Sequence, residues 1–450
     1  MRKTTTLFII IFTHLTLLSC LTFFPYPELF IYPYLVENGL LPYKQIFDQH
    51  LPSFLMMPIN FYDFGLRNEA SAKLFLLVSV FVSHIVIYAI SKILFKGKKL
   101  ILLPNILYLL TQPLFEGYIL WIDSFLAPLL LFSYYLLLSL FRANKKIQIL
   151  LLGLVLGLTL FFKQVMLPLV MSVTFLYYIR DKSKINLGVI ILGIMFPLTL
   201  TLLWIVKQDI LSEFFYWTVS FNFKVYADMA KKLPSLSQLL RFFIFWVPLL
   251  VWSFTKFKNK HVLLLTIFSV LTLFTAFGRF EFVHLQPSLP FIVLISSYLF
   301  FSSAGWKKPY FVLMLIFTFI WWSYLIKNLF LKPSRLFTDD VMSVSRKIDF
   351  LTKENEKIFV LGTQPIVYPL SKRLPAGNVF TVSLPWNMKV TEEKIYAALQ
   401  EDPPVAVVRD IHSTIDGKKV VDFTPKINTF INDNYKLIDK IGENEILVVK

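Results

Sequence analysis

PYKQIFDQHLP, residues 42–52, is a polar stretch that follows the first long apolar segment of the chain. Together with Glu28 it places Lys44, Asp48 and His50 in a region bounded by apolar runs. Acidic, basic and imidazole groups are costly near hydrocarbon unless they line a wet cavity or a site. The stretch therefore predicts a functional site at the edge of a membrane domain.

The composition is that of a polytopic membrane protein. Hydrophobic residues make up 56% of the 450 residues, and 47 residues are Phe, which does not fit a soluble protein. The formal net charge of +17 resides in short basic clusters between apolar runs, as the positive-inside rule requires, so nucleic acid is not an expected partner. The single cysteine, Cys20, excludes a disulfide framework.

Apolar runs predict about eleven transmembrane helices, because each run approaches the length needed to cross ~30 Å of hydrocarbon. They lie near residues 4–24, 71–95, 100–113, 123–141, 147–162, 165–179, 185–206, 239–255, 261–277, 288–304 and 309–329. We interpret the first run as a retained signal anchor, since it lacks a small-residue cleavage site.

Basic clusters predict the orientation of these spans. The clusters assigned to the cytoplasm are Arg2-Lys3, 92–99, 142–146, 180–184, 256–260 and Lys307-Lys308. This assignment puts the amino terminus in the cytoplasm, and an odd number of spans puts the carboxy terminus outside. We therefore expect a multi-pass protein of the cell membrane whose polar stretch at 42–52 faces outward.

Beyond residue 329 the chain becomes polar, which predicts a second domain. Residues 1–329 form the predicted transmembrane domain, whose outward loop 25–70 is rich in aromatic residues and indicates short amphipathic helices in the interface. In the predicted domain 330–450, strands are expected at 357–362, 404–409 and 445–450, and helices at 340–356, 391–400 and 424–434. Near-continuous apolar strands predict a small extracytoplasmic α/β domain with helices on both sheet faces. No glycine-rich phosphate loop follows these strands, which argues against a nucleotide enzyme.

Three further polar sites lie at predicted outward ends of spans. Asp123 follows Glu116 at the fourth span, and the other sites are Lys163-Gln164, between two apolar runs, and a loop with Arg279, Glu281 and His284. Four such sites on one face favour a cavity for an anionic, polar ligand. Phosphate contacts are expected from Lys163, Arg279 and His50. A general base or metal ligand is expected among Glu28, Asp48 and Asp123.

Structural roles remain open as alternatives. Glu28 suits the first turn of a helix, where acids are favoured, and the stem of Lys163 can snorkel to water. Asp123 suits a capping position of the fourth span. Asp48 and His50 could be solvated loop residues. Arg279 and Glu281 could form a local ion pair, and His284 could be structural.

The order of these motifs resembles the integral-membrane glycosyltransferases of the GT-C class. The bacterial proteins similar to protein O-mannosyltransferases (dolichyl-phosphate-mannose mannosyltransferase-like) and to the aminoarabinose transferase of lipid A share it. The similarity rests on NGLLPYKQIFDQHLP at 38–52, on GLVLG at 153–157 before Lys163-Gln164, and on RFEFVH at 279–284 before Leu289-Pro290. It extends into the tail at Leu361-Gly362. The glycine spacing at 153–157 also predicts close helix packing.

The resemblance implies an inverting transfer of a hexosyl or pentosyl group from a polyprenyl-phosphate donor to an extracytoplasmic acceptor, which is a lipid, glycan or protein. Glu28 matches the family's base, with Asp48 as second choice, because the usual Asp-Glu pair is Pro27-Glu28 here. Some relatives use a divalent metal, so such an ion is a candidate cofactor, although no ligand spacing demands it. The residues expected to contact substrate are Lys44, His50, Asp123, Lys163, Gln164, Arg279, Glu281 and His284.

Two other functions are compatible with the sequence. One is a transporter or flippase of lipid-linked saccharides, which would usually show internal repeats and ionisable residues near mid-span. The sequence shows no such repeat, and its polar groups collect at one predicted face. The other is an inactive membrane scaffold, which the missing aspartate at Pro27 keeps as an alternative.

Overall fold

The computed structural model describes residues 2–142, 145–302 and 304–450. Residues 143–144 of the predicted basic cluster 142–146, and residue 303 of the predicted run 288–304, lie outside them. The chain divides into two compact units. The helical unit comprises Met1–Phe24, Ala72–Leu200 and Lys232–Lys332, and the mixed unit comprises Pro25–Ser71, Thr201–Lys231 and Pro333–Lys450. The predicted boundary at 329/330 lies close to Lys332, whereas the whole of the predicted outward loop 25–70 belongs to the mixed unit.

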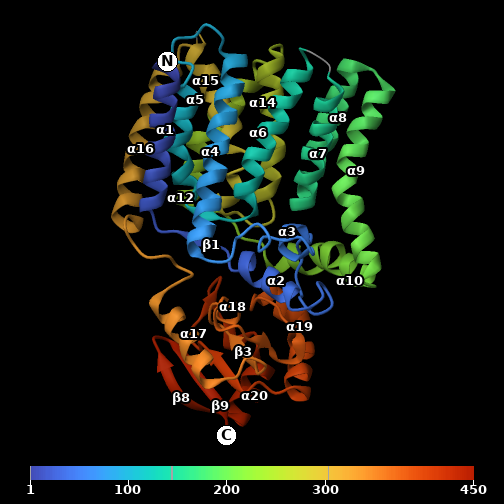
Figure 1. The fold of residues 1–450 in the computed structure, drawn as a ribbon. Coiled ribbons are helices and arrows are strands. Elements are labelled where there is room, and N and C mark those ends of the chain that lie inside the picture. Colours follow the sequence, from blue (N-terminus) through green and yellow to red (C-terminus); the bar gives the residue numbers. More distant parts are fainter. Residues whose placement is uncertain (1, 143–144, 303) are drawn as a thin grey trace. The chain divides into compact units, whose positions relative to one another are not determined.

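A helix is present at each predicted apolar run (Figure 1). These helices are α1 (Arg2–Cys20), α4 (Glu69–Leu94), α5 (Leu103–Thr111), α6 (Ile122–Leu140), α7 (Lys146–Phe162), α8 (Leu167–Asp181), α9 (Lys184–Lys207), α12 (Leu236–Phe245), α13 (Val247–Phe254), α14 (Lys260–Thr272), α15 (Leu289–Phe301) and α16 (Lys307–Leu329). The run at 239–255 forms two helices, because Pro248 at the start of α13 cannot continue the hydrogen bonding of α12. Short elements between them are η1 (Gln112–Phe115), β2 (Ile119–Leu120), η2 (Gln164–Met166), η4 (Leu273–Ala276) and η5 (Phe282–Leu285).

Six of the described helical segments are long and apolar enough to cross a membrane. Three shorter apolar segments accompany them, at Lys146–Phe162, Lys260–Ala276 and Leu289–Phe301. The prediction of a helical, multi-pass membrane protein is confirmed at this level. Eleven crossings stay a prediction, because α5 and several other helices fall short of the length of a full span.

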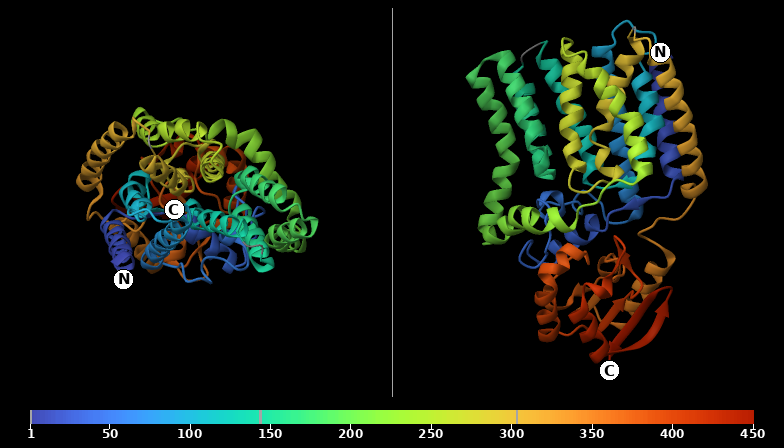
Figure 2. Two further views of the ribbon diagram at one scale, coloured as in Figure 1. Left: turned by 90° about the horizontal axis from the view of Figure 1, so that it is seen from above. Right: turned by 180° about the vertical axis from the view of Figure 1, so that it is seen from behind.

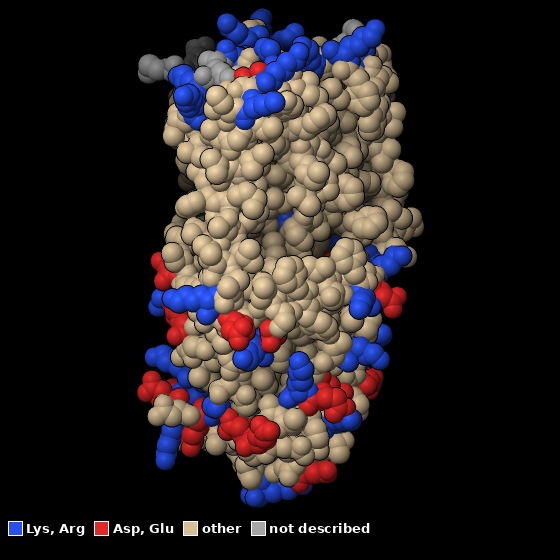
Figure 3. All heavy atoms as spheres, turned by 90° about the vertical axis from the view of Figure 1, so that its right-hand side faces the viewer, with Lys and Arg blue, Asp and Glu red and all other residues tan. Residues whose placement is uncertain are grey.

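The basic loops of the helical unit gather at one end. Figure 2 shows its helices lying side by side, and Figure 3 shows a broad surface on them that is almost without charged residues. Lys and Arg cluster where α1 begins, at the end that also holds the loops α4–α5, α8–α9 and α15–α16. The basic loops therefore share one side, as predicted, and the assignment of that side to the cytoplasm stays a prediction.

Glycines allow α7 to pack closely against α9. A Cβ added to Gly157 would lie 2.5 Å from the Ile194 carbonyl oxygen, and one added to Gly193 would lie 2.8 Å from the Leu154 nitrogen. A Cβ on Gly153 would likewise meet the Ile190 carbonyl oxygen. The predicted close packing at 153–157 is confirmed.

We expect Gly157→Ala to lower the thermal stability of the detergent-solubilised protein. Its added methyl meets backbone, which cannot yield as a side chain does, so a cost of about 1–3 kcal/mol is expected. The control is Gly188→Ala in α9, where an added Cβ meets nothing within 4 Å and better helix propensity should leave stability equal or higher. Equal melting temperatures for Gly157→Ala and the unaltered protein would show that the helices do not approach this closely.

The mixed unit contains a five-stranded sheet in the order β4-β3-β5-β9-β8. The strands are β3 (Lys357–Leu361), β4 (Leu374–Pro375), β5 (Ala406–Arg409), β8 (Tyr435–Ile441) and β9 (Asn444–Val449). β3 runs parallel to β4 and β5, with Val360 opposite Val408, whereas β9 is antiparallel to both β5 and β8. The remaining short elements of this region are the hairpin β6 (Thr414–Ile415) and β7 (Lys418–Lys419), η6 (Ala376–Asn378) and η7 (Val420–Asp422).

Helices cover both faces of this sheet, as the apolar strands predict. α17 (Asp339–Leu351) contacts β5, β8 and β9, and next to it lies α18 (Val367–Ser371). α19 (Pro385–Glu401) and α20 (Pro425–Asn434) contribute Leu399 and Ile431 to the core that contains Phe359 and Val407. The three predicted strands are present, and β4 and β8 are additional to them.

The polar stretch at 42–52 is joined to the carboxy-terminal region by hydrogen bonds. The Phe47 amide donates to the Phe380 carbonyl at 2.8 Å, and the Phe380 amide donates to the Gln45 carbonyl at 2.7 Å. Thr381 Oγ1 donates to the Phe47 carbonyl at 3.0 Å. Short helices precede and follow the stretch, as predicted: α2 (Glu28–Glu37) and α3 (Ser53–Met56). After α9 the mixed unit adds α10 (Leu211–Phe215), the π-helix η3 (Tyr216–Tyr226) and α11 (Ala227–Met229).

Candidate active site

Glu28 is the first residue of α2 and carries a buried carboxyl group. Pro27 precedes it at the N-cap, where its carbonyl accepts hydrogen bonds from the Phe30 and Ile31 amides, both at 3.0 Å. Glu28 is only 8% exposed, and its Oε2 has no hydrogen-bond partner in the part of the chain that the structure describes. The helix-start position expected as an alternative is therefore confirmed, but an unpaired buried carboxyl oxygen is costly for a purely structural role.

Asp48 lies in the same unit and is fully engaged. Its Oδ2 accepts from the Tyr32 hydroxyl at 2.5 Å. Its Oδ1 accepts from both the amide and the Nδ1 of His50, at 2.7 Å each. The Tyr43 hydroxyl donates to the His50 carbonyl at 2.9 Å and so holds the turn that carries the imidazole.

These environments shift the pKa values of the two carboxyl groups in opposite directions. Burial raises the pKa of Glu28 to about 7, and the negative charge of Asp48 acts in the same direction. Burial would also raise the pKa of Asp48, but the charge of His50 and the hydrogen bonds from His50 and Tyr32 hold it below its usual value. A pair of carboxyl groups with divided pKa values is typical of acid–base sites.

A second cluster lies in the helical unit and centres on Asp123, which is fully buried at the start of α6. Lys163 Nζ donates to both Asp123 oxygens, at 2.8 and 2.7 Å. His284 Nδ1 lies 2.8 Å from Asp123 Oδ2 and 3.4 Å from Lys163 Nζ. Because an ammonium only donates and a carboxylate only accepts, the His284 Nδ1 carries the proton and donates it to Asp123.

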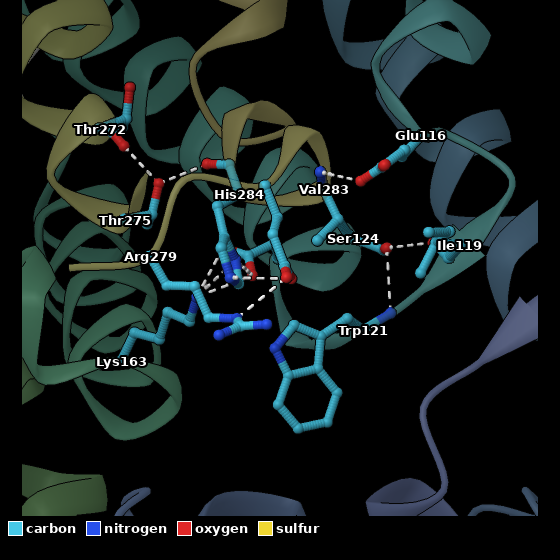
Figure 4. Close-up of polar contacts among 12 residues, drawn as sticks. Glu116, Ile119, Trp121, Ser124, Lys163, Thr272, Thr275, Arg279, Val283 and His284 are labelled. Atoms are coloured by element: carbon cyan, nitrogen blue, oxygen red, sulfur yellow. Dashed lines mark hydrogen bonds and ion pairs between the residues drawn. The ribbon is translucent and has the colours of Figure 1, made fainter. Parts of the chain in front are cut away.

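Arg279 and Glu281 extend this cluster from the loop before η5. Arg279 Nε donates to Glu281 Oε1 at 2.9 Å, and Lys232 Nζ donates to the same oxygen at 3.0 Å. Figure 4 shows Arg279, Lys163 and His284 pointing toward one another. Burial would raise the pKa of Glu281, but Arg279 and His284 hold it below its usual value. Glu116 fixes the loop, because its Oε2 accepts the Val283 amide at 3.0 Å.

The end of α7 positions Lys163 in this cluster. α7 ends at Phe162, and Lys163 adopts an extended conformation before η2, so the apolar run is interrupted where the sequence analysis expects it. Glu116, Asp123, Lys163, Arg279, Glu281 and His284, from three of the four predicted polar sites, therefore lie in one cluster. The remaining predicted site forms the Glu28–Asp48–His50 cluster of the mixed unit.

Two predicted substrate contacts lie outside these clusters. Lys44 is exposed, and its charge acts on Glu213. Gln164 is exposed directly after Lys163. No group of three or more His, Cys, Asp or Glu side chains within residues 2–142, 145–302 and 304–450 is arranged to hold a metal ion.

A buried hydrogen-bond chain supports the second cluster and involves residues that sequence reasoning did not single out. Asn105 Nδ2 donates to His84 Nδ1 at 3.1 Å and to the His84 carbonyl at 2.9 Å. His84 Nε2 lies 2.8 Å from His14 Nδ1, and His14 Nε2 lies 3.1 Å from Gln112 Oε1. Since the amide donates to His84 Nδ1, each imidazole is the neutral tautomer with hydrogen on Nε2.

This chain of hydrogen bonds ends at the loop that carries His284. Gln112 Nε2 donates to the Gly117 carbonyl at 3.0 Å. Gln286 Nε2 in turn donates to the carbonyls of Gln112, at 3.3 Å, and of Phe115, at 2.5 Å. Helices α1, α4 and α5 are thus tied to the backbone around Glu116 and His284. His14 and His84 lie inside apolar runs. A histidine within an apolar run is the one sequence signal that could have indicated this hydrogen-bond chain.

We expect His14→Leu to destabilise the helical unit by about 1–3 kcal/mol, because it leaves the His84 Nε2–H and the Gln112 Oε1 buried without partners. The measurement is the melting temperature in detergent. The matched control is His261→Leu, since His261 Nδ1 has no hydrogen-bond partner within the described residues. An equal loss of stability in the two variants would mean that the chain of hydrogen bonds contributes nothing.

Comparison with known proteins identifies the fold. No protein-family model matches the chain, and no curated protein matches its sequence. Among solved structures, ArnT from Cupriavidus metallidurans in the apo state has a TM-score of 0.62 and 9% identity, over 99% of this chain and 98% of ArnT. ArnT bound to undecaprenyl phosphate has a TM-score of 0.59 and 11% identity, over 99% of this chain and 96% of ArnT.

A weaker similarity is to the oligosaccharyltransferase of Archaeoglobus fulgidus, with a TM-score of 0.43 and 12% identity over 86% of this chain and 63% of that protein. The fold is established by the similarity to ArnT alone, and at identities of 9% and 11% that similarity shows nothing finer than the fold. The similarity to ArnT spans nearly the full length of both chains and agrees with the motif order in the sequence. The chain therefore has the fold of the GT-C class of membrane glycosyltransferases.

Proposed function

We propose that this protein is a membrane glycosyltransferase that moves a sugar from a polyprenyl-phosphate donor to an acceptor hydroxyl outside the cytoplasm. The observation that carries the proposal is the buried Glu28 carboxyl, which has an unpartnered oxygen and a pKa of about 7. The GT-C fold supports the reaction class, and the ArnT structure with undecaprenyl phosphate supports the choice of lipid.

In the proposed reaction, Glu28 accepts the proton of the acceptor hydroxyl. The acceptor oxygen then forms a bond to the anomeric carbon, and the bond from that carbon to the phosphate oxygen breaks. The electron pair of the broken bond leaves with the polyprenyl phosphate, and attack from the opposite side inverts the anomeric centre. A base with a pKa near the working pH combines a useful ionised fraction with adequate basicity.

We assign Asp48 a positioning role rather than the role of base. All of its described contacts are donors, and its depressed pKa makes it a poor proton acceptor at neutral pH. Burial is the main cause of the raised pKa of Glu28, and the negative charge of Asp48 adds to it. Asp48 also orients His50.

The leaving phosphate requires positive charge. We assign this role to Lys163 and Arg279, with His50 as a further contact. Asp123 holds the Lys163 ammonium in place through two of its three N–H donors, which leaves one donor for a phosphate oxygen. Glu281 orients the Arg279 guanidinium in the same way.

Release of free undecaprenyl phosphate tests the proposal without knowledge of the sugar. The purified protein in lipid nanodiscs is given a panel of undecaprenyl-phosphate sugars together with a membrane extract as the source of acceptors. We expect release with at least one donor, and only when the extract is present. Movement of intact donor across the bilayer of sealed proteoliposomes, without release from any donor, would instead support the transporter alternative and contradict the proposal.

A further inference from the structure

A polar cavity lies at the basic end of the helical unit, away from the candidate active site. It has a volume of about 350 Å³ and is lined by α4, α6 and α7. The polar lining residues are Lys92, Tyr135, Ser139, Arg142, Lys145 and Gln148. Asp123 and Ser139 stand near opposite ends of α6, which at a rise of 1.5 Å per residue separates them by about 24 Å. The cavity is therefore distinct from the Asp123 cluster.

Three cations surround this cavity, and each comes from a different segment. Lys92 lies in the last turn of α4, Arg142 follows α6, and Lys145 precedes α7. Arg142 Nη2 donates to the Ile93 carbonyl at 3.4 Å, and Lys92 Nζ stands 5.1 Å from the centre of the Tyr88 ring. No carboxylate pairs with any of the three cations within the described part of the chain. The cavity consequently carries a local positive charge, which a bound anion would neutralise.

Neutral donors complete the lining. Tyr135 and Ser139 contribute hydroxyl groups, and Gln148 contributes an amide. The first turn of α7 begins beside the cavity, and the side chain of its N-cap residue Lys145 makes no capping hydrogen bond. The positive end of the helix dipole favours a phosphate there.

We propose that this cavity binds the phosphate headgroup of an anionic phospholipid. The cavity lies where helices that cross the membrane reach their basic end, which is the depth of lipid phosphates. Its wall also includes Ala89 and Ile93, apolar side chains suited to the glycerol and upper acyl region. A free phosphate ion would use the same donors but not this apolar wall.

The positive-inside rule alone would also place lysines at this end, so a matched control is required. The loop 256–260 offers one, because Lys256, Lys258 and Lys260 carry the same charge at the same end of the helical unit. None of these lysines lines the cavity. Substituting them removes equal surface charge without touching the proposed site.

Native mass spectrometry of the purified protein with added phosphatidylglycerol measures binding directly. The dissociation constant of the first bound phosphatidylglycerol should rise about tenfold or more in the triple variant that combines Lys92→Gln, Arg142→Gln and Lys145→Gln. The control variant Lys256→Gln, Lys258→Gln, Lys260→Gln should change it less than about threefold. Gln148→Glu, a single change that adds a negative charge to the cavity, should also weaken binding. It replaces the triple variant in the test if the triple variant does not fold.

Three outcomes would overturn the proposal. Equal weakening in the triple variant and in its control would reduce the effect to general surface charge. Equal affinity for phosphatidylcholine would show that the cavity does not select an anionic headgroup. Displacement of phosphatidylglycerol by inorganic phosphate at a comparable concentration would show a free-phosphate site instead of a lipid site.

Discussion

Replacing Glu28 by Gln is expected to abolish sugar transfer while raising thermal stability above neutral pH. Loss of a general base typically costs about 10²–10⁴-fold in rate. The stability effect follows from the raised pKa: burial favours the neutral acid, so the folded state holds this proton more tightly than the unfolded state. Glutamine is neutral at every pH and keeps the buried oxygen and shape of the side chain.

The sign of the pH dependence is fixed by the pKa of Glu28, which moves from 4.5 to about 7. The stabilisation from burying the neutral acid is fully present below pH 4.5 and is lost as the pH rises through about 7. At about pH 8 the free energy of unfolding of Glu28→Gln should therefore exceed that of the unaltered protein by up to roughly 3 kcal/mol, and Glu28→Gln should melt at a higher temperature. At about pH 4 the two proteins should melt at the same temperature.

The matched control for this variant is Glu37→Gln, at the other end of α2. Glu37 is an exposed partner of Arg67, at 3.2 Å, and a surface pair contributes only about 0–1 kcal/mol. We expect it to leave both the transfer rate and the pH dependence of melting nearly unchanged. A Glu28→Gln protein that transfers sugar at the normal rate would remove Glu28 from the mechanism.

Replacing Lys163 by Met is expected to give the largest loss of stability. Asp123 is fully buried, and removing its ammonium partner leaves only His284 to compensate its charge, a change that typically costs about 3–5 kcal/mol. The double variant Lys163→Met with Asp123→Leu should recover much of this loss, because neither charge of the buried pair remains. It should still fail to transfer sugar, since the proposed phosphate contact is gone.

Melting temperatures and undecaprenyl phosphate release of the two single variants and the double variant measure this coupling. The control is Lys347→Met, which breaks the pair of Lys347 with Asp439, at 2.8 Å, and should leave stability nearly unchanged because the pair lies in water. A Lys163→Met protein as stable as this control would show that the Asp123–Lys163 pair does not hold the helical unit together.

Much of the helical architecture is predictable because spanning helices are long apolar runs with basic ends. The interruption at Lys163 is equally visible, since a lone cation between two apolar runs needs a partner. That partner, Asp123, is 40 residues away, and one sequence does not specify which acid it is. The same reason hides the His14–His84 pair, in which each imidazole lies within an apolar run.

The mixed unit shows a different limit. β8 escapes prediction because it is an edge strand with charged residues and a register shift between Leu437 and Asp439, which disrupts its alternation. The pairing of Phe47 with Phe380 joins segments 333 residues apart, so loop composition does not reveal it. The contact between Asp48 and His50, by contrast, spans two residues and is within reach of local sequence reasoning.

Pro27 acquires a structural explanation. The missing aspartate at this position keeps an inactive scaffold as an alternative when only the sequence is considered. In the structure, Pro27 forms the N-cap of α2 with φ −62° and ψ −28°, and its fixed φ suits the start of a helix. The change from aspartate therefore leaves Glu28 in the first turn of α2.

The pH dependence of kcat/KM for undecaprenyl phosphate release tests the central claim most directly. With Glu28 as base, kcat/KM should fall about tenfold per pH unit below an apparent pKa of about 7. Asp48→Asn should move that pKa downward, because it removes the negative charge that disfavours ionisation of Glu28. A kcat/KM that stays constant through this range, or an unchanged acid limb in Glu28→Gln, would contradict the account.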